Sequence, residues 1–316
     1  MDPDHVRTNC DAILDEVERA VISDREVLRS ILVGLLSDGH ILLEDVPGTG
    51  KTLTARSIAD TVGLSFSRIQ FTPDLLPSDV TGANVFDEAT REFEFQPGPI
   101  FGNVVLADEI NRAPPKTQAA LLEAMAEGQV TVDGETHDLP EPFVVIATQN
   151  PVEMDGTFEL PAAQKDRFMI KTSLGYPDFE GELQLVDRRA DRRAQIPSVE
   201  QVCTPETIES LRAAPERITV ESEVRRYLVT IARETRRDNR VSAGVSPRGI
   251  QRFFEAVRTQ AAIQGRSYAT PDDVKAIAPK VLSHRIVLSA DARVDQIDPE
   301  EIIEGILGAV NVPQLT

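Results

Sequence analysis

The segment from Ile41 to Thr52, ILLEDVPGTGKT, constrains the fold of this chain more than any other part of the sequence. Its apolar start predicts a buried strand, its Pro- and Gly-rich middle a tight turn, and the following residues 53–59 a helix. Glycines let backbone N–H groups approach an anion, and the helix N-terminus adds the positive end of its dipole. The segment therefore predicts a phosphate-binding loop on an α/β sheet.

The side chains of this loop have distinct expected roles. Lys51 would reach the β- and γ-phosphates of a nucleotide, and the Thr52 hydroxyl would bind Mg²⁺. Asp45 stands where the usual pattern begins with glycine. Its charge would weaken ATP binding if it lay at the mouth of the loop; alternatively, Asp45 has a structural role, such as bonding a loop N–H. The residues expected to contact nucleotide are Pro47, Gly48, Thr49, Gly50, Lys51, Thr52 and Leu53.

Two further apolar runs end in polar residues suited to phosphate chemistry. Residues 103–107 predict a buried strand, followed by Asp108 and Glu109. A carboxylate at the carboxyl end of a parallel strand beside a phosphate loop can hold Mg²⁺, which suits Asp108. Glu109 could then orient and deprotonate an attacking water. A second run, residues 143–148, leads to Asn150, whose amide is expected near the phosphates.

Hydrophobic periodicity divides the chain into two parts. Strands alternate with helices up to about residue 177, which predicts a parallel sheet covered on both faces. Asp133-Gly134 predicts a hairpin within residues 129–139, and residues 71–102 form a long insert. We therefore expect an α/β domain over residues 1–177 and a smaller all-helical domain over residues 178–316. The helices expected in the second part are 180–193, 205–213, 221–238, 247–264 and 271–283.

The net charge of −19 restricts the partners of the protein. Phosphate neutralisation needs net positive charge, so broad binding to nucleic acid is disfavoured. An acidic, lysine-poor surface suits very high salt, and a halophilic host is our hypothesis for the source. No apolar run reaches the length of a membrane span, and the first residues carry acids and no apolar segment. We therefore expect a cytoplasmic protein.

Four segments, in this order, closely resemble the MoxR family of AAA+ ATPases: VPGTGKT at 46–52, LADEINRAPPK at 106–116, ATQNP at 147–151 and LPAAQKDRF at 160–168. The resemblance implies a P-loop sheet domain with a helical lid, ATP hydrolysis with Mg²⁺, and a ring that is usually hexameric. It assigns Lys51 and Thr52 to Walker A, Asp108 and Glu109 to Walker B, and Asn150 to the first sensor.

The same resemblance assigns two arginines. Arg167 matches the arginine finger, which would project onto the γ-phosphate of a neighbouring subunit, and Arg248 matches the second sensor in the lid. Proteins of this family look like chaperones that remodel or assemble other complexes. Their partners often carry a von Willebrand factor A domain.

Three alternatives use the same nucleotide chemistry. A DNA-acting AAA+ motor related to replicative helicases shares the insert and the hairpin, but the acidic charge and the lack of Lys or Arg at the hairpin tip, residues 132–135, disfavour it. A magnesium-chelatase-like subunit would drive metal insertion. A nucleotide-gated scaffold would show little turnover.

Overall fold

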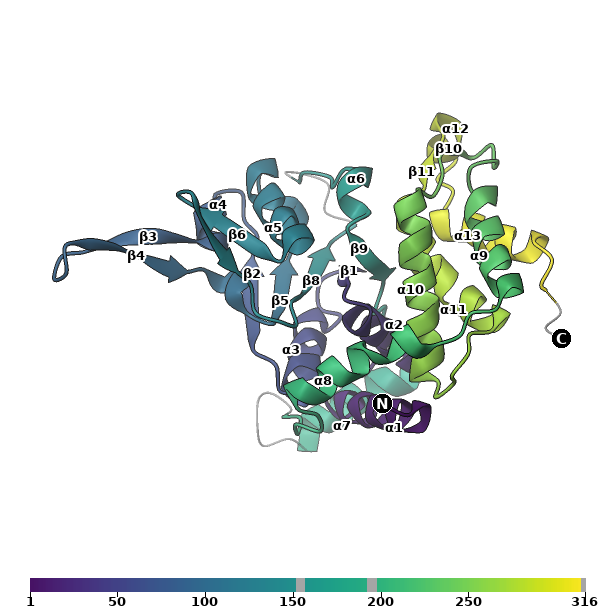
Figure 1. Ribbon diagram of the computed structural model, residues 1–316, viewed down its shortest axis with the longest axis horizontal. Helices are drawn as coiled ribbons and strands as arrows, with labels where there is room; N and C mark the ends of the chain where they lie inside the picture. Colours follow the sequence, from purple (N-terminus) through teal and green to yellow (C-terminus); the bar gives the residue numbers. More distant parts are fainter. Residues whose placement is uncertain (152–156, 192–197, 314–316) are drawn as a thin grey trace.

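A computed structural model describes residues 1–151, 157–191 and 198–313. A five-stranded parallel sheet in the order β2-β5-β8-β1-β9 forms its centre (Figure 1). In the register, Leu42 on β1 pairs with Ala147 on β8. Nearly every residue of the three middle strands is buried, as a sheet covered on both faces requires. The strands are β1 His40–Glu44, β2 Phe66–Gln70, β5 Val104–Asp108, β8 Val144–Gln149 and β9 Phe168–Thr172.

Alternate strand residues build two separate cores, one on each face of the sheet. Ile41 and Leu43 pack in a cluster with α1 Pro3–Ala20, α2 Arg25–Leu36 and α3 Lys51–Thr61. Leu42, between them, packs in a second cluster with α5 Pro115–Glu127. Because successive side chains on a strand point to opposite faces, one apolar run fills both cores. The expected three-layer α/β domain is confirmed.

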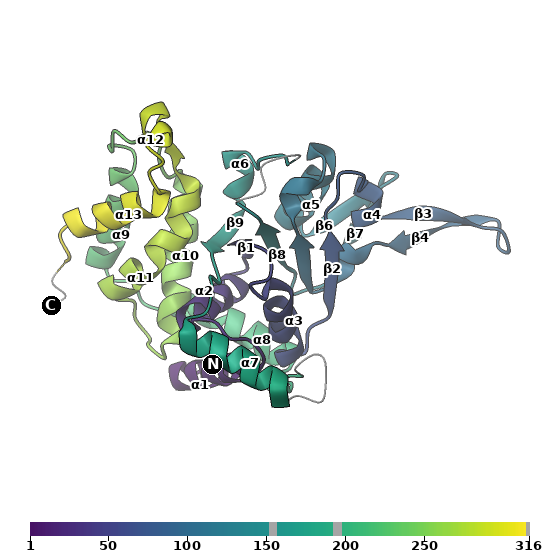
Figure 2. The same ribbon diagram turned by 180° about the vertical axis from the view of Figure 1, so that it is seen from behind.

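Two antiparallel hairpins extend the sheet domain on the side away from the lid (Figures 1 and 2). The hairpin of β6 Gln129–Val132 and β7 Glu135–Asp138 turns at Asp133 and Gly134, as predicted, with positive φ angles of 50° and 89°. The insert forms a second hairpin, β3 Gly82–Asp87 and β4 Glu92–Pro97, after the short helix α4 Pro77–Thr81. Phe95 stacks on His137 with ring centroids 3.8 Å apart, so the two hairpins touch.

Helices dominate the remainder of the chain. The expected helical lid is confirmed, but it is not purely helical. It also contains a short antiparallel pair, β10 Val241–Ala243 with β11 Val287–Leu288, and strands of two or three residues are too short to be recognised by periodicity. The helix expected at 180–193 is seen to Asp191; residues 192 and 193 lie outside the described part. The helices are α7 Phe179–Asp191, α8 Pro205–Arg212, α9 Ser222–Glu234, α10 Pro247–Ile263, α11 Pro271–Leu282, α12 Ala290–Val294 and α13 Pro299–Ala309.

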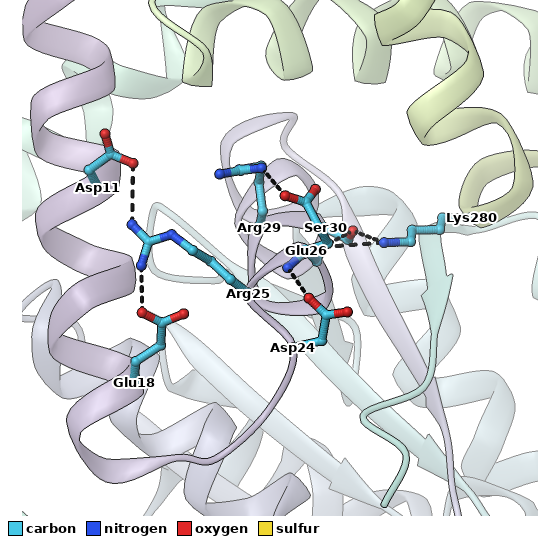
Figure 3. A network of polar contacts seen from close by, with 8 residues as sticks. All are labelled: Asp11, Glu18, Asp24, Arg25, Glu26, Arg29, Ser30 and Lys280. Carbon is cyan, nitrogen blue, oxygen red and sulfur yellow. Dashed lines mark hydrogen bonds and ion pairs between the residues drawn. The ribbon is translucent and has the colours of Figure 1, made fainter. Parts of the chain in front are cut away.

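A polar network joins the lid to the sheet domain (Figure 3). Lys280 on α11 donates to Ser30 Oγ at 2.6 Å and to the Glu26 carbonyl at 3.3 Å, both on α2. Arg25, at the start of α2, forms ion pairs with Asp11 and Glu18 on α1. The lid is thus fastened to α2, which packs on β1 and β9, and Arg25 ties α2 to α1. No helix in the described ranges is long and apolar enough to cross a membrane.

Candidate nucleotide site

The loop between β1 and α3 has the conformation that anion binding requires. Gly48 and Gly50 have φ angles of 88° and 90°, and a Cβ at either position would meet no atom within 4 Å. Glycine is therefore favoured by backbone conformation, which costs other residues energy, and not by lack of space. Gly50 is the N-cap of α3 and supplies no side-chain cap, so the first N–H groups of the helix are available to a phosphate.

Lys51 lies folded over this loop. Its Nζ donates to the carbonyl oxygens of Asp45 and Val46 at 2.9 and 2.8 Å. Burial lowers the pKa of Lys51, while the carboxylates of Asp45, Asp108 and Glu109 oppose that shift. The ammonium is thus positioned at the loop with neutral carbonyl partners, which a phosphate can replace with stronger charged ones.

Asp45 does not line the cavity of the phosphate loop; its carboxylate is bound to residues 173–175. Its buried carboxylate accepts hydrogen bonds from Ser173 Oγ at 2.8 Å, Leu174 N at 2.7 Å and Gly175 N at 3.0 Å. The structural alternative is the better account, but its donors follow β9 and are not part of the phosphate loop. Asp45 thereby ties the start of the loop to the end of the edge strand.

Replacing Asp45 by alanine is expected to lower the free energy of unfolding by about 2–4 kcal/mol, because three donors to a buried charge lose their acceptor. Chemical denaturation with Asp60→Ala as control measures this, since Asp60 is an exposed aspartate on α3. A stability equal to that of the control would contradict the structural role.

The two acids after β5 occupy the carboxyl edge of the sheet. Asp108 Oδ1 accepts from Thr148 Oγ1 at 2.7 Å, and Asp108 Oδ2 forms an ion pair with Arg68 Nη2 at 2.6 Å. Thr148 Oγ1 also accepts from the backbone N–H of Glu109 at 2.8 Å. Thr148 on β8 therefore bonds to both Asp108 and Glu109, and it fixes the position of the two acids relative to each other.

Glu109 is held in an uncommon conformation. Its φ of 58° lies in the left-handed region, which side chains other than glycine rarely adopt and which is associated with functional sites. Its Oε2 accepts from Gln70 Nε2 at 2.8 Å and pairs with Arg112 Nη1 at 3.0 Å. The carboxylate is thus held at the strand edge beside Asp108.

Three residues that were not predicted from the sequence hold these acids: Arg68, Gln70 and Thr148. Arg68 and Gln70 are two apart on β2, so they share a face of the sheet, and β2 pairs in register with β5. The spacing of two residues predicts that both side chains lie on one face of a strand. It does not predict that they reach Asp108, because that depends on the strand order, which places β2 beside β5.

The phosphate loop, the two acids, Arg68 and Thr148 line one cavity of about 430 Å³. Among the expected loop residues, Thr49 does not line this cavity; its hydroxyl donates to the Val46 carbonyl at 3.3 Å. The cavity combines helix N–H groups and an ammonium, which suit phosphates, with the hydroxyl and carboxylate oxygens that Mg²⁺ prefers. The residues present therefore fit magnesium and a nucleotide. Those lining it are Pro47, Gly48, Gly50, Lys51, Thr52, Leu53, Arg68, Asp108, Glu109, Thr148, Gln149 and Asn150.

Arg167 and Arg248 line a different cavity, of about 710 Å³. Arg167 precedes β9 and donates through Nη1 to the Leu122 carbonyl at 2.7 Å. Arg248 is exposed in the first turn of α10. Three more arginines line this cavity, each paired with an acid: Arg212 with Asp38, Arg252 with Glu255 and Arg258 with Glu216. The structure thus separates the two predicted catalytic arginines from this chain's own phosphate loop.

Two stretches of the chain, one in the sheet domain and one in the lid, match known protein families. Residues 40–170 match the ATPase family associated with various cellular activities (AAA), and residues 233–306 match the AAA lid domain. The chain is 46% identical to the uncharacterized protein YeaC of Bacillus subtilis (strain 168), over 95% of this chain and 93% of that protein.

Two further proteins are similar over most of their length. Chaperone MoxR1 of Mycobacterium tuberculosis (strain H37Rv) is 41% identical, over 95% of this chain and 81% of that protein. The crystal structure of a candidate ATPase from Cytophaga hutchinsonii superposes with a TM-score of 0.90 at 37% identity, covering 99% of this chain and 97% of the other.

Proposed function

The chain belongs to the MoxR family of AAA+ ATPases, and from this premise we propose that it hydrolyses ATP with Mg²⁺ to remodel or assemble client protein complexes. The observation that carries the proposal is the convergence of the phosphate loop, both acids and Asn150 on one cavity. The name of the relative Chaperone MoxR1 supports a protein client.

In this proposal the loop residues bind and orient the triphosphate. The N–H groups at the start of α3 and the Lys51 ammonium would donate hydrogen bonds to its phosphate oxygens, and Thr52 and Asp108 would hold Mg²⁺. Bound magnesium would neutralise charge on the β- and γ-phosphates. Asn150, buried directly after β8, faces the same cavity and would orient the γ-phosphate or the water.

Hydrolysis requires a water held in line with the γ-phosphorus. Glu109 accepts a proton from that water as its oxygen bonds to phosphorus, and the bond to the bridging oxygen of ADP breaks. Gln70 and Arg112 keep the carboxylate of Glu109 in place before the reaction. Correct placement of the reactants provides much of the rate enhancement in such sites.

The two arginines act on a neighbour's nucleotide in this proposal. Arg167 and Arg248 share a cavity that is not lined by the phosphate loop of their own chain. A ring of identical subunits, which the family resemblance implies is hexameric, would place this cavity against the next phosphate loop. A guanidinium from each of the two domains would then reach the same γ-phosphate.

Lys51→Ala is expected to abolish tight ATP binding, because the phosphates lose the only lysine of the loop. Calorimetry with ATP and Mg²⁺ measures the affinity, and Lys116→Ala, an exposed lysine at the start of α5, is the matched control. Binding within a few-fold of the unaltered protein would refute the assignment of the loop.

The client proposal can be tested by trapping. A Glu109→Gln variant that binds ATP without hydrolysing it should retain its client, and partners with a von Willebrand factor A domain are expected among the retained proteins by family resemblance. The Lys51→Ala/Glu109→Gln double variant is the control, since it cannot reach the ATP-bound state. Equal recovery with both variants would contradict ATP-dependent client binding.

A further inference from the structure

A buried arginine of the lid, Arg285, lies against the segment of the sheet domain that carries Arg167. Its side chain is 1% exposed and ends the 3₁₀ turn Ser283–Arg285 that follows α11. An arginine in such a place needs partners for its charge and its N–H groups. Most of those partners come from outside the lid.

The partners of Arg285 flank Arg167 on both sides along the chain. Its Nε pairs with Asp166 Oδ1 at 2.9 Å, Nη2 donates to the Phe168 carbonyl at 2.6 Å, and Nη1 donates to the Met169 carbonyl at 3.3 Å. Arg167 stands between these partners, at the turn between α6 Ala162–Lys165 and β9. The lid therefore fixes the backbone immediately before and after the predicted arginine finger.

The neighbouring histidine reinforces this contact. His284 Nε2 lies 2.7 Å from Arg285 Nη1 and can accept its N–H, and the Phe168 carbonyl oxygen is 3.0 Å from the same nitrogen. Burial, and then the charge of Arg285, hold the pKa of His284 well below its usual value, so the ring is neutral near pH 7. Burial lowers the pKa of Arg285 to about 10, which leaves it charged. The ion pair between the charged Arg285 of the lid and Asp166 of the sheet domain thus joins the two domains at this point.

We propose that Arg285 is a positioning residue that holds Arg167 in place from the lid, so that each subunit can stabilise hydrolysis in its neighbour only while its own lid is docked. The inference rests on the proposed trans-acting role of Arg167. The side chain of Arg167 donates to the Leu122 carbonyl at 2.7 Å, and its starting point is the backbone that Arg285 holds on both sides. A shift of about 1 Å in such a group can cost about 10²-fold in rate.

Mixed-subunit ATPase assays separate positioning from a loss of folding. Arg285→Gln alone should bind ATP normally by calorimetry but hydrolyse it about 10²-fold more slowly. Mixed with Lys51→Ala, it should recover to roughly a quarter of the normal rate, because about one interface in four then joins an intact loop to an intact finger. Mixed with Arg167→Ala, it should stay inactive, since neither chain supplies a working finger.

One further mixture, Arg167→Ala with Lys51→Ala, shows which proposal fails when it is compared with the first two. If Arg167→Ala with Lys51→Ala recovers activity but Arg285→Gln with Lys51→Ala does not, the positioning role of Arg285 is overturned while the trans-acting finger stands. Activity in the mixture of Arg285→Gln with Arg167→Ala also overturns it. No recovery for Arg167→Ala with Lys51→Ala, in rings with proven subunit exchange, overturns the trans assignment and the inference that rests on it.

Two variants guard against a trivial loss of stability. Asp166→Asn removes the partner charge while keeping the size of the side chain, and the same mixtures should give the same pattern if Arg285→Gln fails to fold. Arg266→Gln is the matched control, because Arg266 forms a partly buried ion pair with Asp273 wholly within the lid. It should lower the melting temperature yet hydrolyse ATP at close to the normal rate on its own, because every finger in that ring comes from an Arg266→Gln chain. A loss of about 10²-fold would show that any loss of lid stability has this effect, and would overturn a specific role for Arg285.

Discussion

Replacing Arg167 by alanine is expected to lower the ATPase rate of the assembled protein by about 10³–10⁵-fold, the value of an arginine finger in other P-loop enzymes. Nucleotide affinity should change little, because Arg167 does not line the cavity formed by its own phosphate loop. Steady-state turnover and calorimetry on the same preparation measure the two effects separately.

The matched control for this variant is Arg258→Ala. Arg258 lines the same cavity as Arg167, but its guanidinium is paired with Glu216 at 2.9 Å. Arg258→Ala therefore removes a positive charge from the cavity without removing a guanidinium that is expected to reach the neighbour's nucleotide. The specific activity of the unaltered protein should also rise with concentration while the ring assembles. Activity independent of concentration in a proven monomer would rule out a finger supplied by a neighbour.

Glu109→Gln is expected to slow hydrolysis by about 10²–10⁴-fold while ATP still binds, because the amide has nearly the same shape but cannot accept a proton from water. Glu109 is hydrogen-bonded to Gln70 and Arg112. Glutamine is therefore a better test than alanine, because it removes the negative charge while keeping a side chain that can still bond to these neighbours. Single-turnover hydrolysis after rapid mixing isolates the chemical step from product release.

Glu123→Gln supplies the same chemical change at an exposed position of α5, away from the strand edge. It should retain the normal rate. If Glu109→Gln also hydrolyses ATP at the normal rate, Glu109 has no part in activating the water, and another group near Asp108 must do so.

The sequence alone determined the parts of this protein that depend on local chemistry. The loop from Val46 to Thr52 was predictable because only glycine adopts its positive φ angles easily and because Lys51 follows at a fixed spacing. The buried strands were predictable because continuous apolar runs leave no solvent-facing side. The hairpin turn at Asp133-Gly134 was predictable for the same local reason, since two left-handed residues are needed there.

Tertiary structure alone decided which distant residues meet. Asp45 departs from the glycine that usually begins the phosphate loop, and its carboxylate binds residues 173–175, more than a hundred positions away. Arg68 reaches Asp108 because β2 and β5 are neighbours, and Arg285 reaches Asp166 because α11 docks beside β9. Residues in such pairs are far apart in the chain, and no fixed spacing or periodicity in the sequence predicts that they meet. They arise when the sheet order and the docking of the lid bring buried charges together, and each charge then needs the partner that the fold supplies.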